Sequence, residues 1–262
     1  MPQRPRLIVG NWKMHKTIPQ AHDLVDGLIH LVGNKVRPGI SVVLAPPFTA
    51  LSAVAQRIAG HPFLLGAQNL HWEDRGAFTG EISAEMLRDA GCQYVLVGHS
   101  ERRRYFAESD SIVQKKAAAA LRHELRPILC VGETWDHRET GQMERVLSLQ
   151  LSEGLGGIDK ARAQDVAVAY EPVWAIGSGK AATAEQAAEA HRYIRLQLVA
   201  LWGHDAATRV PVLYGGSVVP GNIGELLAIP DVDGALVGGA CLDPMQFARI
   251  LRVAQDVVAQ DV

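Results

Sequence analysis

The chain has 262 residues, of which 48% are hydrophobic and 21% are charged, and its formal net charge is -2. This composition supports a large core in one domain, or in two small ones, and it excludes a global field that would recruit nucleic acid or an anionic membrane. No apolar stretch is long enough to span a bilayer. The segment from Met1 to Arg6 lacks the apolar run of a secretory signal, so we expect none.

The three cysteines, Cys92, Cys130 and Cys241, are odd in number and include no C-x-x-C pair. We therefore expect a reducing compartment, the cytoplasm, and no metal site built of thiolates. Cys130 lies inside an apolar run and is most simply a small core residue.

Eight short apolar runs recur along the chain, and each is followed by a helical pattern or by room for a helix. They are Leu7–Asn11, Ile40–Leu44, Phe63–Ala67, Tyr94–Val97, Ile128–Val131, Val166–Tyr170, Val210–Tyr214 and Ala235–Val237. Strands that alternate with helices imply a parallel sheet with right-handed crossovers. Eight such units in roughly 250 residues suit a closed (β/α)8 barrel with outer helices, in the α/β class. We expect a single domain over residues 1–262.

An open doubly wound sheet is the alternative architecture. To bind a dinucleotide it would need a G-x-G-x-x-G turn after the first strand, and Gly10-Asn11-Trp12-Lys13 is not one. The clearest helical patterns are Ala21–Val32, Thr49–Ile58 and Thr183–Trp202, and Thr183 with Gln186 reads as the capping box of the last.

The connection from Gln68 to Glu81 is long for such a barrel and contains no evident element. It carries two aromatic residues, Trp72 and Phe78, beside glycines. One interpretation is that both aromatics fold back onto their own barrel. The other is that the loop docks on another subunit, because a loop cannot bury two aromatic side chains alone.

Polar residues and glycines stand where the predicted strands end. In a closed barrel these ends open on one face, where catalytic groups gather. They are Asn11, Lys13, His99, Glu101, Glu171, Ser217 after Gly215-Gly216, and Gly238-Gly239. This set contains a carboxylate, an imidazole and an ammonium, but no clustered carboxylate–histidine metal shell and no G-x-S-x-G elbow. It indicates metal-free proton transfer on a small anionic substrate.

Glu171 stands out because it directly follows a wholly apolar run that Pro172 cannot extend. Gly177 and Gly179 give the next loop unusual backbone freedom. A carboxylate at a strand end, with a loop able to close over it, is suited to hold a general base away from water.

The two glycine turns after the seventh and eighth runs leave backbone N–H groups open to a phosphate. Short helices that start near Asn222 and after Gly239 would add N-termini that favour an anion. One Gly-Gly pair alone would suggest only a tight turn, but two pairs after the last two strands favour phosphate binding. Taken singly, His99 could be structural, and Lys13 is more often a surface charge. We expect the Arg102–Arg104 run to be solvated or paired rather than to bind nucleic acid.

Together these strand ends resemble the triosephosphate isomerase family. Seven stretches match in the family's order: Gly10–Met14, Gly76–Glu81, Gly98–Arg103, Ile128–Glu133, Ala169–Gly177, Tyr214–Val218 and Leu236–Ala240. The resemblance implies a TIM barrel and the interconversion of dihydroxyacetone phosphate and D-glyceraldehyde 3-phosphate through an enediolate, in glycolysis and gluconeogenesis. It implies no metal and no cofactor. The family usually has threonine at Ser178 and serine at Cys241.

The resemblance also implies roles for individual residues. Glu171 is expected to be the base that moves the proton, and His99 the electrophile that polarises the carbonyl. Lys13 is expected to stabilise enediolate and phosphate charge, with Asn11 as a polar neighbour and Glu101 as a supporting carboxylate.

For substrate binding, the resemblance implies Asn11 and Lys13 together with backbone donors at Gly177, Ser217, Gly238 and Gly239. It further implies a homodimer in which the Gln68–Glu81 loop enters the partner's site, with Thr79 near Asn11.

Two other functions remain open at this point. A Schiff-base aldolase on a phosphate-binding barrel would use Lys13 as its nucleophile. Such a lysine needs apolar surroundings that lower its pKa, and the sequence shows none around Lys13. A non-catalytic barrel scaffold would need none of these groups, and the intact set of Lys13, His99 and Glu171 argues against it.

Overall fold

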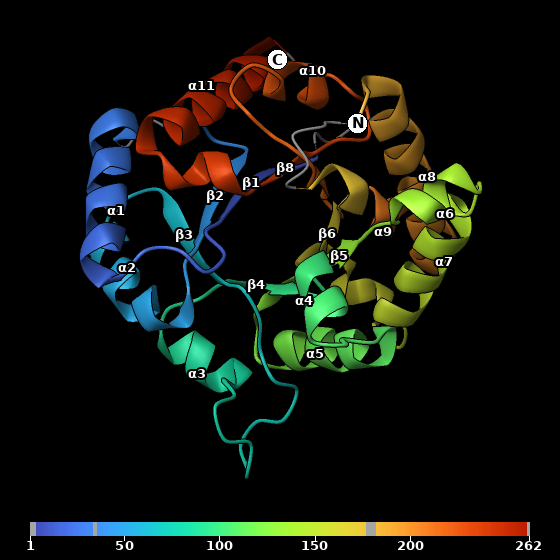
Figure 1. Ribbon diagram of the computed structural model, residues 1–262, viewed down its shortest axis with the longest axis horizontal. Coiled ribbons are helices and arrows are strands. Elements are labelled where there is room, and N and C mark those ends of the chain that lie inside the picture. The colour runs from blue at the N-terminus through green and yellow to red at the C-terminus, as the bar shows by residue number, and fades with distance from the viewer. Residues whose placement is uncertain (1–3, 34–35, 177–181, 261–262) are drawn as a thin grey trace.

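The structure, a computed structural model, describes residues 4–33, 36–176 and 182–260. Within these residues, parallel strands pair in sequence order and close into a barrel, and Figure 1 shows the helices as a ring around it. The strands are β1 (Arg6–Asn11), β2 (Ile40–Ala45), β3 (Phe63–Ala67), β4 (Tyr94–Val97), β5 (Arg126–Val131), β6 (Ala167–Tyr170), β7 (Val212–Tyr214) and β8 (Gly234–Val237). The predicted (β/α)8 barrel is confirmed, and the alternative of an open sheet is wrong.

The helices follow the strands around the ring. They are α1 (Ile18–Val32), α2 (Leu51–Ile58), α3 (Ala84–Asp89), α4 (Ser100–Tyr105), α5 (Asp110–Arg122), α6 (Trp135–Glu139), α7 (Met143–Gly154), α8 (Ala184–Trp202), α9 (His204–Ala207), α10 (Ile223–Leu227) and α11 (Pro244–Gln260). Four 3-10 turns accompany them: η1 (Phe48–Ala50), η2 (Lys160–Asp165), η3 (Val173–Ala175) and η4 (Gly239–Leu242). Among the described helices, none has both the length and the apolar character needed to cross a membrane.

Several element boundaries differ from the prediction by a few residues. Helix α1 begins at Ile18 rather than Ala21, because the Gln20 side chain accepts the N–H of Thr17 at 3.0 Å and so closes the first turn earlier. Val166 lies outside β6, because its N–H bonds back to Ala163 at the end of η2. The capping box of α8, with Thr183 and Gln186, is confirmed.

Side chains along each strand alternate between two apolar clusters, as a period of two requires. On β1, Leu7 and Val9 belong to the smaller cluster inside the barrel, and Ile8 belongs to the larger cluster between strands and helices. Cys130 lies in the interior cluster, as predicted for a core residue. All three cysteines are free and buried.

The connection between β3 and α3 projects beyond the ring of helices (Figure 1). Trp72 packs against the main core, and the Lys115 ammonium lies 5.4 Å from its ring centroid. The centroid of the Phe78 ring lies 4.3 Å from that of His71, with the rings tilted by 34°, but Phe78 remains 43% exposed. The interpretation that the loop folds back onto its own barrel therefore holds for Trp72, whereas Phe78 keeps a free face.

Candidate active site

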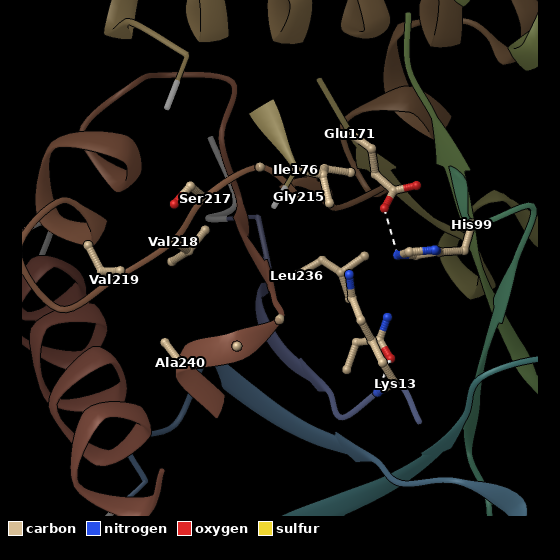
Figure 2. Close-up of a pocket in the computed structure, with 14 residues that line it drawn as sticks. Lys13, His99, Glu171, Ile176, Gly215, Ser217, Val218, Val219, Leu236 and Ala240 are labelled. Atoms are coloured by element: carbon tan, nitrogen blue, oxygen red, sulfur yellow. Dashed lines mark hydrogen bonds and ion pairs between the residues drawn. The ribbon is translucent and has the colours of Figure 1, made fainter. Parts of the chain in front are cut away.

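The carboxyl ends of the strands surround a cavity of about 330 Å³. Its lining includes seven residues predicted for the site: Asn11, Lys13, His99, Glu171, Ser217, Gly238 and Gly239. Figure 2 shows Glu171 and His99 on one side of this space, with Ser217 and Ala240 on the other. Glu101 is not among the lining residues but pairs with Lys13, and Gly177 lies outside the described residues.

Glu171 is placed by the end of β6, where its N–H donates to the carbonyl of Val131 at 2.7 Å. Its side chain is only 2% exposed. One carboxylate oxygen lies 2.8 Å from Nε2 of His99, drawn as the dashed line in Figure 2, and the other accepts the N–H of Ser100 at 2.9 Å. Burial raises the pKa of Glu171, but these two partners outweigh it, and the net pKa is lowered. The carboxylate is therefore ionised near neutral pH, as a general base must be.

His99 is the N-cap residue of α4, and the N–H of Glu101 donates to its Nδ1 at 3.3 Å. This hydrogen bond assigns the ring proton to Nε2, the nitrogen that faces Glu171. Burial lowers the pKa of His99, but the Glu171 carboxylate outweighs that effect and the net pKa is raised. The ring thus presents an N–H donor at the cavity, which could serve a carboxylate or a substrate carbonyl oxygen.

Lys13 has a φ of 53°, a left-handed backbone conformation that a non-glycine residue adopts at a cost. Asn11 Oδ1 accepts its N–H at 3.0 Å, and Gln68 Nε2 donates to its carbonyl at 2.9 Å. The Gln68 amide also donates to the carbonyl of Ala45 at 2.9 Å. The Lys13 ammonium pairs with Glu101 at 2.6 Å. Three neighbouring segments therefore hold this strained residue and its charge at the cavity.

The glycine turns line the cavity from Glu171 to its opposite side: a Cβ at Gly215 would lie 3.1 Å from Cγ of Glu171, whereas Ser217 and Ala240 lie across the cavity (Figure 2). Among the described residues, the backbone N–H groups of Ser217 and Gly239 have no protein acceptor. A Cβ at Gly216 would lie 2.3 Å from the hydroxyl oxygen of Tyr214, so this close approach requires glycine. Free N–H groups facing a cavity that also holds the Lys13 ammonium favour an anionic ligand. The predicted short helices here are confirmed as α10 and η4.

Sequence reasoning did not assign several residues that shape this site. Gln68 follows β3 directly, so its polar side chain at a strand end was a readable signal. Ser100 contributes only its backbone N–H, which no sequence pattern reveals. Glu133, after β5, is fully buried, and it accepts the Tyr170 hydroxyl at 2.9 Å and the Trp174 indole N–H at 3.0 Å. It thereby ties the segment that follows Glu171 to β5.

The Arg102–Arg104 run is largely engaged within the chain. Arg102 pairs with Glu108, and Arg103 pairs with Asp110, which fits the paired interpretation of this run. In the part of the chain that the structure describes, no group of three or more His, Cys, Asp or Glu side chains is arranged to hold a metal ion.

Comparison with known proteins identifies the family. The sequence model described as Triosephosphate isomerase matches residues 6–254. A protein of this name from Moorella thermoacetica is 53% identical, covering 97% of this chain and 100% of the relative. Another, from Geotalea uraniireducens, is 48% identical, covering 96% and 100%. The crystal structure of triosephosphate isomerase from Bartonella henselae superimposes with a TM-score of 0.86 at 38% identity, covering 96% and 99%. The chain belongs to the triosephosphate isomerase family.

Proposed function

We propose that this chain interconverts dihydroxyacetone phosphate and D-glyceraldehyde 3-phosphate by moving a proton between neighbouring carbons. The observation that carries the proposal is the convergence of the Glu171 carboxylate, the His99 N–H and the Lys13 ammonium on one cavity. The opposite wall offers free backbone donors for a phosphate. Family membership supports the same reaction.

In the proposed chemistry, Glu171 is the base. Removing a proton beside a carbonyl leaves an enediolate, whose negative charge must be met by fixed donors for the barrier to fall. His99 Nε2–H and the Lys13 ammonium are those donors. A substrate carbonyl that accepts the His99 N–H would replace Glu171 as its partner, and this exchange frees the carboxylate to take the proton.

The phosphate would sit on the Ser217 turn and on Gly238-Gly239, with Asn11 and Lys13 beside it. Gly177 belongs to the same proposed set but lies outside the described residues. Glu101 would steady the Lys13 ammonium through their 2.6 Å ion pair. Because the phosphate does not react, its binding energy can be used to hold the reacting carbons against Glu171.

The aldolase alternative requires a neutral lysine amine as nucleophile. The Glu101 carboxylate, 2.6 Å from Lys13 Nζ, stabilises the charged ammonium and so argues against this role. A non-catalytic scaffold would have no use for a buried base held by an imidazole.

We further propose a homodimer formed through the Gln68–Glu81 loop, and a cytoplasmic location. The exposed face of Phe78 at the loop and the 94% exposure of Met14 near the cavity leave apolar surface that a second copy would cover. The three free cysteines fit a reducing compartment. The whole chain, residues 1–262, would act as one domain.

The decisive experiment is an assay of purified protein on D-glyceraldehyde 3-phosphate in the presence of a metal chelator. We expect full turnover to dihydroxyacetone phosphate. An absence of isomerisation, or its loss with the chelator, would refute the proposal. Borohydride treatment with dihydroxyacetone phosphate separates the aldolase alternative, since a Schiff base on Lys13 would be trapped as a covalent adduct; we expect no adduct.

A further inference from the structure

The turn that carries Ser217 is held by a residue outside the cavity. The side-chain amide of Asn222 donates from Nδ2 to the carbonyl of Ser217 at 2.9 Å, and its Oδ1 accepts the N–H of Val219 at 2.9 Å. Both Ser217 and Val219 line the cavity, on the wall opposite Glu171 in Figure 2, whereas Asn222 does not. One amide thus spans the two ends of the lining segment.

The two bonds also settle the orientation of the amide. The Ser217 carbonyl can only accept and the Val219 N–H can only donate, so exchanging the Asn222 nitrogen and oxygen would break both contacts. The backbone of Asn222 adds a third restraint, because its N–H donates to the carbonyl of Val219 at 3.2 Å.

The segment lies outside any helix or strand, and its other anchors are the buried Val218 side chain and the N–H of Ile223, which donates to the Val219 carbonyl at 3.3 Å. Strand β7 ends at Tyr214, and α10 begins only at Ile223. The N–H of Ser217 has no acceptor among the described residues, and Val219 is 41% exposed. A donor that must meet an anion at a fixed distance contributes most when it is ordered before binding, since otherwise ordering opposes binding.

We propose that Asn222 is a positioning residue for the phosphate, which it controls by clamping the Ser217–Val219 turn and not by touching the ligand. This inference rests on the proposed function, because it assigns the turn to the substrate's phosphate. It predicts a split between binding and chemistry: Asn222 governs phosphate affinity, while Glu171 moves the proton and His99 stabilises the charge on the reacting oxygens.

The test compares wild type, Asn222→Ala and the neighbouring control Gly221→Ala, at which an added Cβ meets nothing within 4 Å. Three quantities are measured: KM and kcat on D-glyceraldehyde 3-phosphate, inhibition by inorganic phosphate, and kcat/KM on unphosphorylated D-glyceraldehyde. For the loss of two positioning hydrogen bonds, we expect Asn222→Ala to raise KM and the phosphate inhibition constant about tenfold. Its kcat/KM on D-glyceraldehyde should stay at the wild-type value, as should all values for the control.

Asn222→Ser provides a second variant in case the alanine protein does not fold. Its hydroxyl can still accept the Val219 N–H, as in related turns, but the amide donor to Ser217 is gone. Because only one of the two hydrogen bonds is lost, it should show a smaller rise in KM and in the phosphate inhibition constant, about threefold. Unchanged phosphate inhibition in a folded variant would overturn the inference, and so would an equal loss on D-glyceraldehyde, which would indicate general damage. An inactive wild type would instead refute the proposed function itself.

Discussion

Gly132, directly after β5, is the position where one added methyl group would most directly displace the proposed base. A Cβ built there would lie 1.7 Å from the carbonyl oxygen of Glu171 and 2.6 Å from its carbonyl carbon. The backbones must therefore separate by about 1.3 Å to reach the 3.0 Å that Cβ contacts normally keep. Hydrogen bonds hold both backbone segments in place. The Gln150 side-chain amide accepts the N–H of Gly132 and donates to its carbonyl, and the N–H of Glu171 donates to the carbonyl of Val131.

Gly132→Ala should therefore move the Glu171 carboxylate by about an ångström, and a displacement of that size lowers turnover by roughly 100-fold. Overpacking of the same contact should cost about 1–3 kcal/mol of unfolding free energy. Steady-state kinetics on D-glyceraldehyde 3-phosphate and urea unfolding measure the two effects, with Gly221→Ala as the matched control. A Gly132→Ala protein with wild-type kcat would refute the reasoning, because it would show that the base tolerates this displacement.

Three further predictions test the site, a buried histidine and the assembly. Glu171→Asp retracts the carboxylate by one methylene, and it should lower kcat by about 100-fold or more with an unchanged melting temperature; near-normal turnover would remove Glu171 from its role. His191 is fully buried and its Nε2 has no partner among the described residues; burial lowers its pKa from 6.5 to about 4. As the pH falls, this histidine takes up a proton in the unfolded chain before it does so in the folded one, which favours unfolding. Its contribution to the free energy of unfolding is therefore intact above pH 6.5, and about 3 kcal/mol of it is lost as the pH falls towards 4. Urea unfolding at pH 7 and pH 4 should show this loss of unfolding free energy in wild type and a smaller loss in His191→Asn. Equal losses in the two proteins would contradict the role given to His191. Thr79→Arg should weaken self-association in analytical ultracentrifugation and lower activity together, whereas Ala200→Arg on the exposed side of α8 should do neither; a fully active Thr79→Arg monomer would count against a shared site.

Much of the fold was readable from the sequence because a buried parallel strand and an amphipathic helix each have a local pattern. Eight apolar runs, each followed by a helix or room for one, were enough to predict the closed barrel. The boundaries were less exact, since competing local hydrogen bonds decide them, as at Val166 and at the start of α1. The prediction that the strand ends share one face placed Glu171, His99 and Lys13 together in advance.

The sequence by itself thus determined the strand order, the chemical groups at the strand ends and, through its matched motifs, the family. Only the tertiary structure decided how these groups are restrained. It brought Glu171 within 2.8 Å of His99, held Lys13 in a left-handed conformation through Gln68, and left no room for a side chain at Gly132. The physical reason is that propensity and periodicity act between residues near in sequence, whereas these contacts join segments that meet only when the barrel closes.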